Sequence, residues 1–281
     1  MSYVLFDIGG TNTRVTVSDD LQSFVRPIKF KTPQVFSEGI DKIVEAVVTL
    51  TEGKGPVRAM AGGVRGMLGE DRDMIAQDDI LTKWIEKPLV KTLEKKLKTK
   101  VYLENDAAVA GLGESHFGAG VGIDIMVYHT ISTGVGGAKI ENGLVDSYNV
   151  GFEPGRQILD IDRTILGDDV LPTLENLVSG SAVEARTGQK PYDIPQSDTI
   201  WDQLAFYLAH GLRNTVLYWS PDVIVLGGSM IVGNPRILLD DIRRHTQEVL
   251  GEDIPCPLIK DAELKDDGGL YGAMALLSSK V

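Results

Sequence analysis

The 281-residue sequence contains a single cysteine, Cys256, so no disulfide can form within the chain. It has no apolar run long enough to span a bilayer, and its first residues, MSYVLFDIGG, lack the basic segment and long apolar segment of a secretory leader. These absences argue against a disulfide scaffold and a membrane-spanning protein. They predict a soluble, cytoplasmic protein.

Basic residues are scarce relative to acidic ones. The chain has 28 Lys and Arg against 40 Asp and Glu, a formal net charge of -12. Because nucleic-acid binding depends on clustered Lys and Arg that neutralise phosphates, this balance argues against a polyanion as the main partner. Small anions held by backbone amides stay open as ligands.

The length favours two lobes or one large domain, and two lobes would suggest a cleft. Glycine is abundant, with 31 residues, and its placement is informative. The glycines gather mostly where strand-like runs stop. These clusters are Gly9–Gly10, Gly62–Gly63, Gly134 with Gly136 and Gly137, Gly227–Gly228 and Gly268–Gly269.

The first third of the chain predicts an α/β pattern. VLFDI (4–8) and TRVTV (13–17) are β-branched, apolar runs separated by GGTN, which predicts a hairpin with a tight glycine turn. A third strand is expected near 25–30. Apolar residues then recur at helical spacing from Ile40, predicting a helix that ends around 53–56 and precedes a strand at 57–62.

The rest of the chain repeats this alternation. Expected helices cover about 84–98, the segment after 105, 198–219, 235–250 and the glycine-bordered end of the chain, and expected strands cover 101–105, 124–132 and DVIVLGG (222–228). GVGG (134–137) is expected to be a tight turn, and Asn142–Gly143 the turn of a hairpin. The pattern strand, glycine turn, strand occurs near the start and again from 124, which suggests an internal duplication with two halves facing a cleft.

Asp7 is an acid between Phe6 and Ile8 at the end of an apolar strand. An acid in such a place is costly unless it is paired or binds a cation. Mg²⁺ bridging nucleotide phosphates, often through water, would supply the cation. The alternative is that Asp7 caps the turn by accepting from the amides of Gly9 or Gly10.

The segment LENDAA (103–108) ends a strand with three polar residues and then begins a helix. Asn105 or Asp106 would cap the first free amides of that helix. Asp106 would alternatively be a general base that takes a proton from a substrate hydroxyl, with Asn105 bonding a neighbouring hydroxyl. The two interpretations are compatible.

The glycine turns can hold phosphate oxygens, because glycine lets backbone amides approach closely. Each turn alone is a weak signal, since most such turns serve only hairpin geometry. Together they predict a nucleotide site, since they lie at strand ends and two of them carry the hydroxyls of Thr11 and Thr133.

Six segments, taken in order, resemble the ROK family of sugar kinases within the actin, hexokinase and Hsp70 ATPase superfamily. The resemblance spans nearly the whole chain. The segments are DIGGTNTR (7–14), LENDAAVAG (103–111), ISTGVGGAKIENG (131–143), GFEPGR (151–156), LENLVSG (174–180) and VIVLGG (223–228).

The resemblance implies a role for each matching residue. Asn105 and Asp106 match a sugar-binding pair whose Asp is the catalytic base, and Glu153 and Glu175 match acids that bind hydroxyls around the anomeric end of the sugar. Gly63, with Arg65 in GGVRG, matches a turn lining the sugar pocket. The implied nucleotide residues are Asp7 on the metal side with Gly9, Gly10, Thr11 and Asn12, then Thr133, Gly134, Gly136 and Gly137, and Gly227 and Gly228 for the adenosine.

Two departures from the family pattern concern the sugar end. Arg156 stands where the family commonly has a sugar-contacting, often zinc-linked His. Before Glu175 the family usually has a cysteine-rich zinc loop, whereas this chain reads GDDVLPTLE (167–175). We therefore expect no structural zinc. Arg156 would bind sugar hydroxyls, or pair with Glu153 and replace what zinc does for the loop.

The resemblance implies a two-lobed, ribonuclease-H-like α/β fold with the active site in the cleft between lobes. The first lobe is expected at 1–117, with the helix at 268–281 returning to it, and the second at 118–267. ATP and Mg²⁺ are the expected cofactors, with Asp7 holding the metal through water, and a hexose is the expected substrate. The 6-hydroxyl of glucose is the first choice, while mannose, fructose, N-acetylglucosamine and N-acetylmannosamine stay open. A homodimer is compatible with the resemblance.

Two other classes compete with a sugar kinase. The same family contains sugar-sensing repressors, which carry a DNA-binding segment ahead of the first phosphate motif; Asp7 near the start of this chain and its acidic charge argue against that class. An actin-type ATPase without a sugar is the third interpretation. The triplet END (104–106) and the two glutamates argue against it.

Overall fold

The computed structural model describes residues 2–149 and 151–281, which form two compact units. Unit 1 comprises the chain up to Phe117 together with Ser147–Gly151 and Asp266–Val281. Unit 2 comprises Gly118–Asp146 and Phe152–Lys265. The division expected from the sequence differs at 147–151 and at 266–267, which it places in the second lobe.

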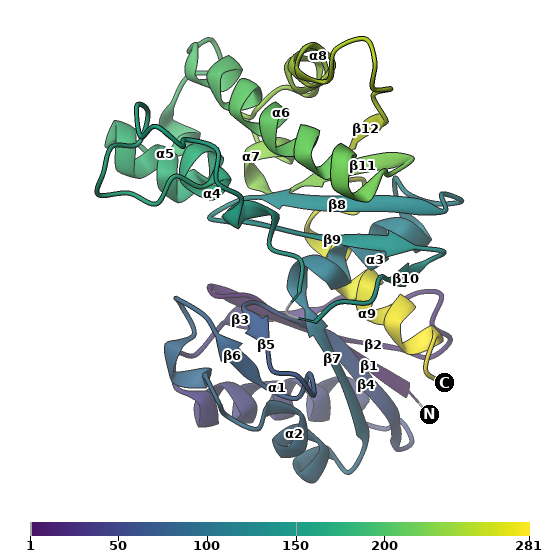
Figure 1. The fold of residues 1–281 in the computed structure, drawn as a ribbon. Helices are drawn as coiled ribbons and strands as arrows, with labels where there is room; N and C mark the ends of the chain where they lie inside the picture. The colour runs from purple at the N-terminus through teal and green to yellow at the C-terminus, as the bar shows by residue number, and fades with distance from the viewer. Residues whose placement is uncertain (1, 150) are drawn as a thin grey trace. The chain divides into compact units, whose positions relative to one another are not determined.

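Unit 1 is built on a five-stranded sheet with strand order β3-β2-β1-β4-β7 (Figure 1). β1 and β2 form the expected antiparallel hairpin, β3 extends it, and β4 and β7 run parallel to β1. The strands are β1 (Ser2–Ile8), β2 (Asn12–Ser18), β3 (Ile28–Lys31), β4 (Val57–Val64) and β7 (Lys100–Asn105).

Helices cover both faces of this sheet. α1 (Phe36–Thr51) and α2 (Leu89–Leu97) pack on the face that carries Phe6 and Ile8. The apolar residues of α3 (Asp106–Phe117) and α9 (Gly268–Ser278) pack on the opposite face with Leu5. The connection from β4 to α2 contains the strands β5 (Met67–Leu68) and β6 (Ile75–Gln77) and the 3-10 helix η1 (Thr82–Trp84).

The helix expected from Trp84 begins later, at Leu89. Pro88 comes directly before it, where the missing amide costs no helical hydrogen bond. Trp84 itself lies in η1, where its indole donates to the carbonyl of Pro33 at 3.0 Å. The side chain is 1% exposed, and Trp84 belongs to the apolar core of unit 1.

Unit 2 contains a second five-stranded sheet, with order β10-β9-β8-β11-β12. β8 and β9 are antiparallel, β10 extends the hairpin through the expected Asn142–Gly143 turn, and β11 and β12 run parallel to β8. The strands are β8 (Ile125–Ile131), β9 (Val135–Glu141), β10 (Leu144–Val145), β11 (Val223–Gly227) and β12 (Leu258–Asp261).

The expected GVGG turn is wrong by two residues. The chain reverses at Ser132–Gly134, and Gly136 and Gly137 lie inside β9, paired with Thr130 and His129. The helix expected from Pro235 begins at Leu239. The remaining helices are α4 (Leu174–Val178), α5 (Gly180–Thr187), α6 (Ile200–Trp219), α7 (Ser229–Val232), α8 (Leu239–Leu250) and the 3-10 turns η2 (Pro154–Arg156), η3 (Pro191–Asp193) and η4 (Lys265–Asp267).

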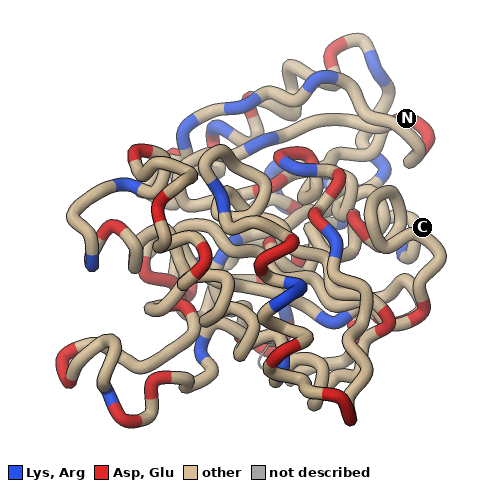
Figure 2. The backbone as a smooth tube through the Cα atoms, turned by 90° about the horizontal axis from the view of Figure 1, so that it is seen from above, with Lys and Arg blue, Asp and Glu red and all other residues tan. Residues whose placement is uncertain are grey.

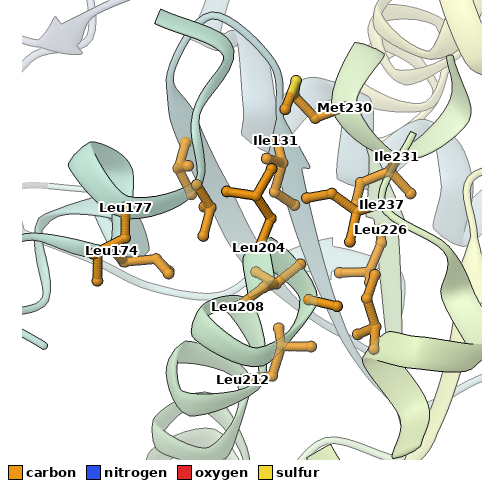
Figure 3. Packing of buried hydrophobic residues seen from close by; sticks show 14 of the residues in the cluster. Ile131, Leu174, Leu177, Leu204, Leu208, Leu212, Leu226, Met230, Ile231 and Ile237 are labelled. Carbon is orange, nitrogen blue, oxygen red and sulfur yellow. The ribbon is translucent and has the colours of Figure 1, made fainter. Parts of the chain in front are cut away.

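One apolar core holds unit 2 together (Figure 3). Leu204, Leu208 and Leu212 recur at helical spacing along α6 and face the sheet residues Ile131 and Leu226. α4 contributes Leu174 and Leu177 to the same core, and α7 contributes Met230 and Ile231. This core therefore fixes the end of β8, where the second glycine turn begins.

The two sheets share one topology. In each, a hairpin is extended by a third strand on one side and by two parallel strands on the other (Figure 1). A long helix comes after the third strand in both units. In unit 1 this helix is α1, and in unit 2 it is α6, which the shorter α4 and α5 precede. The internal duplication suggested by the sequence is thus confirmed at the level of strand order and direction.

His129 lies inside β8 and is fully buried. A histidine inside a strand is typical of a core position, in which both ring nitrogens have hydrogen-bond partners. Nε2 does lie 3.0 Å from the hydroxyl of Thr215, but Nδ1 has no partner among the described residues. The ring stacks on Trp219 with 6.3 Å between centroids, and burial lowers the pKa of His129 to about 4.

The free energy of unfolding is expected to fall as the pH drops from 6.5, the ordinary pKa of histidine, to about 4. Over this range the unfolded chain binds a proton that the buried ring refuses, and the full loss is about 3 kcal/mol. Urea denaturation at several pH values measures it. His129→Phe should flatten this slope, because the titrating ring is gone. The Thr215 hydroxyl keeps a hydrogen bond in this variant, since it still donates to the Gly211 carbonyl. An equal slope in the variant would contradict the assignment.

Charged residues of both signs are interspersed along the backbone of both units (Figure 2). Several acids are paired, as in the contacts of Arg236 with Asp261 and of Lys139 with Asp146. Within the two described stretches, no helix combines the length and apolar character needed to cross a membrane.

Candidate functional site

The candidate residues of unit 1 gather because three parallel strands end side by side. Asp7 on β1 pairs in register with Gly63 on β4, which pairs with Glu104 on β7. One position further, Val64 pairs with Asn105. In parallel sheets the carboxyl ends of the strands meet at one edge, where ligands commonly bind. The structure thus brings Asp7, Gly63, Asn105 and Asp106 to a single edge.

The first glycine turn is closed by its own backbone. The Gly9 amide donates to the Asn12 carbonyl at 3.0 Å, and the Thr32 hydroxyl donates to the Gly9 carbonyl at 2.7 Å. The Gly9 amide and the Asn12 carbonyl therefore shape the turn. The amides of Gly10 and Thr11 have no acceptor among the described residues, and they are the ones available to a phosphate.

Asp7 is largely buried, with its side chain 16% exposed. Its carboxylate accepts from Arg14 at 3.0 Å, and the Gly9 amide is engaged elsewhere, which contradicts the idea that Asp7 caps Gly9. Burial raises the pKa of Asp7, and the Arg14 charge opposes that rise. Arg14 also donates to Asp266 at 2.9 Å.

The donor set around Asp7 suits magnesium held through water. Among the described residues, no three His, Cys, Asp or Glu side chains gather into a metal cluster. Mg²⁺ in nucleotide sites keeps several waters and commonly uses one or two carboxylates plus the phosphates. A lone carboxylate beside a glycine turn fits that requirement.

Asn105 caps helix α3. Its Oδ1 accepts from the amides of Ala107 and Ala108 at 2.9 and 3.2 Å, and its Nδ2 donates to the Gly66 carbonyl at 3.1 Å. The capping interpretation is therefore confirmed for this residue. One N–H of the amide group is left for a substrate, and its direction is fixed by the other three bonds.

Asp106 is the first residue of α3, and its Oδ1 accepts from the Ala107 amide at 2.9 Å. Burial, followed by the negative charge of Asp7, raises the pKa of Asp106 to about 6. The backbone hydrogen bond and the positive charge of Arg65 oppose the rise. Such a carboxylate is ionised at pH 7 and more basic than an ordinary Asp, which suits a general base.

In unit 2 the second glycine turn is bound by the helices beside it. The Gly180 amide, at the start of α5, donates to the Ser132 carbonyl at 2.7 Å. Glu175 on α4 accepts from the Val135 amide at 2.8 Å, and any Cβ on Gly134 would lie 2.7 Å from the same oxygen. Thr133 is exposed at the tip of the turn. One carboxylate oxygen of Glu175 is thus already engaged.

Three expected nucleotide glycines are also required by packing. A Cβ on Gly137 would collide with the Tyr128 carbonyl, and one on Gly227 would collide with the Tyr128 ring. Gly228 has φ +87° and lies against the Ile131 carbonyl. Their identity is explained without a ligand, so their role in nucleotide binding stays a prediction, as does that of Gly136.

Glu153 directly precedes the 3-10 turn η2, and Arg156 is the last residue of that turn. Arg156 Nε lies 3.4 Å from Glu153 Oε2, so the pairing weighed from the sequence is present. The Arg156 side chain is 61% exposed, which makes this ion pair a weak contribution to stability. Burial raises the pKa of Glu153, Arg156 opposes the rise, and Glu175 adds to it.

The loop that leads into GDDVLPTLE (167–175) is held by side chains. Asp160 is 1% exposed and accepts from the amides of Ile165 and Leu166, the latter at 2.7 Å. Arg163 donates to the Val170 carbonyl at 2.7 Å. The buried Asp160 carboxylate and the Arg163 guanidinium thus supply the hydrogen-bond partners of these backbone amides and of this carbonyl, so the loop is held without a metal ion. The absence of zinc itself stays a prediction that elemental analysis tests.

Asp160→Ala is expected to speed tryptic cleavage after Arg163, because two backbone amides lose their acceptor and the loop opens more often. Limited proteolysis followed by mass spectrometry measures the rate. Asp162→Ala is the matched control, since the exposed Asp162 carboxylate accepts, among the residues that the structure describes, only from the Thr164 side chain. Equal cleavage in both variants would contradict the role of Asp160.

Sequence reasoning missed the partners of the expected site residues. Glu104 accepts from Arg72 at 2.8 Å and from the Tyr148 hydroxyl, and it also accepts from the Asn105 amide. Asp160 went unnoticed in the same way. Sequence separations of up to 44 residues give no local signal for such contacts.

The ROK family model matches residues 3–280. The chain belongs to the ROK family. A fructokinase of Lactococcus lactis subsp. cremoris is 27% identical over 99% of both chains. A ROK hexokinase from Thermus thermophilus superposes with a TM-score of 0.80, at 28% identity over 100% of this chain and 99% of that one.

A third similar protein is a ROK glucokinase from Streptomyces griseus, solved with glucose and AMPPNP. Its TM-score is 0.79, with 25% identity over 98% of this chain and 99% of that one. These full-length matches confirm the expected fold class and the expected ATP-dependent sugar kinase. The names of the three proteins differ in their sugars, so this ROK chain's own sugar is not decided by similarity.

Proposed function

We propose that this ROK chain transfers the γ-phosphoryl group of ATP to a hexose hydroxyl, with the 6-hydroxyl of glucose as the first candidate. The observation that carries the proposal is Asp106, a carboxylate of raised pKa at the same strand-end edge as Asp7. Fructose is the second candidate, because the fructokinase relative matches the whole chain. Mannose, N-acetylglucosamine and N-acetylmannosamine complete the set to be tested.

The proposed roles draw on the geometry of each unit. In unit 1, Asp106 accepts the proton of the attacking hydroxyl, and the remaining N–H of Asn105 donates to a neighbouring hydroxyl. The amides of Gly10 and Thr11 stabilise charge on the phosphate, with Gly63 leaving room beside Asp106. Asp7 would hold Mg²⁺ through water, and the bound ion would supply positive charge to the nucleotide phosphates.

Unit 2 supplies the other expected contacts. The turn at Thr133 and Gly134 and the segment at Gly227 and Gly228 serve the nucleotide. Glu153 and the free oxygen of Glu175 accept from sugar hydroxyls, and Arg156 limits how far Glu153 moves. The side chain of Arg156 is exposed, so it remains accessible to a sugar as a donor.

A panel of hexoses with ATP, followed by ADP release in a coupled assay, tests the proposal. We expect one hexose to raise the rate of ADP release by about 10²-fold or more over ATP alone. The reason is that a bound sugar hydroxyl can use Asp106 as a general base, which is worth at least about this factor. The positional test is a mass and NMR analysis of the product, which should carry phosphate on the 6-hydroxyl. ATP hydrolysis that no hexose stimulates would contradict the proposal and favour the sugar-sensing or actin-type alternatives.

Homodimer formation and a cytoplasmic location stay predictions.

A further inference from the structure

Arg65 lies at the edge of the sheet where the proposed phosphate turn begins. It follows the last residue of β4, and its amide donates to the Ile8 carbonyl at 3.1 Å. That carbonyl belongs to the residue directly before Gly9. The backbone therefore fixes Arg65 relative to the glycine turn, with both in unit 1.

The guanidinium group lies over Gly10. A Cβ on Gly10 would sit 3.0 Å from Arg65 Nη1 and 3.1 Å from its Cδ. Gly10 supplies one of the two amides that remain for a phosphate. A phosphate oxygen on that amide would therefore have a positively charged donor beside it, which is the arrangement that binds phosphoryl groups most strongly.

Two carboxylates orient this guanidinium group. Nε donates to Asp78 at 2.8 Å, and Nη2 donates to Asp79 at 2.6 Å. Asp78 is 2% exposed and is itself held by the Leu81 amide at 2.7 Å. Nη1 is the nitrogen without an acceptor in the described part of the chain, and it is also the one beside Gly10.

We infer that Arg65 is a catalytic residue whose Nη1 contacts the phosphoryl group in transfer, rather than the sugar alone. This inference rests on the proposed function. A guanidinium fixed in advance by two carboxylates needs no reorganisation when charge develops on the phosphoryl group. Its charge also opposes the rise in the pKa of Asp106.

A structural role or a sugar-binding role for Arg65 would produce different results. If Arg65 only ties the segment 66–81 to the sheet, its loss lowers stability and leaves ligand preference unchanged. If Arg65 binds sugar hydroxyls, as the resemblance of the GGVRG turn suggests, its loss raises the KM for the sugar. If Arg65 contacts the phosphoryl group, its loss instead reduces the difference in affinity between nucleotides that carry a γ-phosphate and nucleotides that lack one.

The test compares the affinity for Mg-AMPPNP and Mg-ADP by calorimetry in wild type and Arg65→Met. We expect the Kd for AMPPNP to rise by about tenfold or more, while the Kd for ADP stays within about twofold. In the coupled assay kcat should fall by about 10²-fold or more, with the sugar KM little changed. Arg58→Met is the matched control on the same strand, where the guanidinium lies over the Tyr3 ring.

Removing Arg65 leaves Asp78 buried without its cation, which endangers folding. The double variant Arg65→Met with Asp78→Asn removes both charges and keeps an acceptor for the Leu81 amide. The same loss of AMPPNP preference is expected there. An unchanged preference in either folded variant would overturn the inference, whether or not the sugar KM rises.

The nucleotide titrations need no sugar, so the two proposals fail in different ways. Wild type that phosphorylates no hexose contradicts the proposed function even if Arg65 selects AMPPNP. Wild type that phosphorylates a hexose, with Arg65→Met as selective for AMPPNP as wild type, contradicts only the role of Arg65.

Discussion

Asp106→Asn is expected to fold and to lose nearly all sugar phosphorylation. Asn keeps the acceptor for the Ala107 amide at the start of α3, but it cannot take the proton of the attacking hydroxyl. General-base help is worth about 10²- to 10⁴-fold, and kcat should fall by that factor. The sugar should still bind weakly, which a calorimetric titration measures. Near-wild-type turnover in this variant would contradict the assignment of the base.

The pH profile is a second readout of the same residue. Because the pKa of Asp106 is raised to about 6, wild-type kcat/KM should decline as the pH falls through 6 and level off above it. An ordinary Asp would keep its activity to about pH 4. A profile flat from pH 7.5 to 4.5 would contradict the raised pKa.

The stability of Asp106→Asn should exceed that of wild type at pH 7.5. Folding raises the pKa of this carboxyl from 3.8 to about 6, so the ionised form is penalised in the folded state. The penalty is absent below pH 4, where both states are protonated, and it is complete above pH 6. Allowing for partial exposure, about 1–2 kcal/mol is expected by urea denaturation at pH 7.5, and none at pH 3.5.

Gly272→Ala is expected to destabilise unit 1 severely. Helices α3 and α9 cross so closely that a Cβ on Gly272 would overlap the Val109 carbonyl. The same crossing brings Gly113 against the backbone of Gly268 and Gly272. A methyl group cannot be absorbed by backbone on both sides, so the helices must separate, at a cost of about 3 kcal/mol or more.

Thermal and urea denaturation measure the effect, and reduced yield of folded protein would accompany it. Gly69→Ala is the control, because the nearest atom to its Cβ would be Met74 Cγ at an ordinary 3.4 Å. α9 also carries Gly269 against the Asp7 carboxylate, so any folded Gly272→Ala protein should bind Mg-ATP more weakly. Equal stability of the two variants would show that α3 and α9 can move apart freely.

Much of the fold could be predicted from the sequence because its signals are local. The β-branched, apolar runs on either side of the GGTN turn predicted the β1–β2 hairpin, and helical spacing predicted α1 and α6. The errors occurred where local patterns compete. The helix expected from Trp84 begins only at Leu89, directly after Pro88. GVGG has the composition of a turn, although Gly136 and Gly137 lie within β9.

The candidate site divides in the same way. The sequence by itself determined the residue types at the strand ends, because Asp7, the glycine turns and the END triplet are short contiguous motifs. Only the tertiary structure decided which groups are free to act. In the folded protein the Gly9 amide and most hydrogen-bonding groups of the Asn105 side chain are bound to backbone atoms. Burial and the charge of Asp7 raise the pKa of Asp106. The Arg65 guanidinium lies over Gly10 and is held by two carboxylates. Burial, register and charge pairing depend on residues distant in the chain, and no local pattern encodes them.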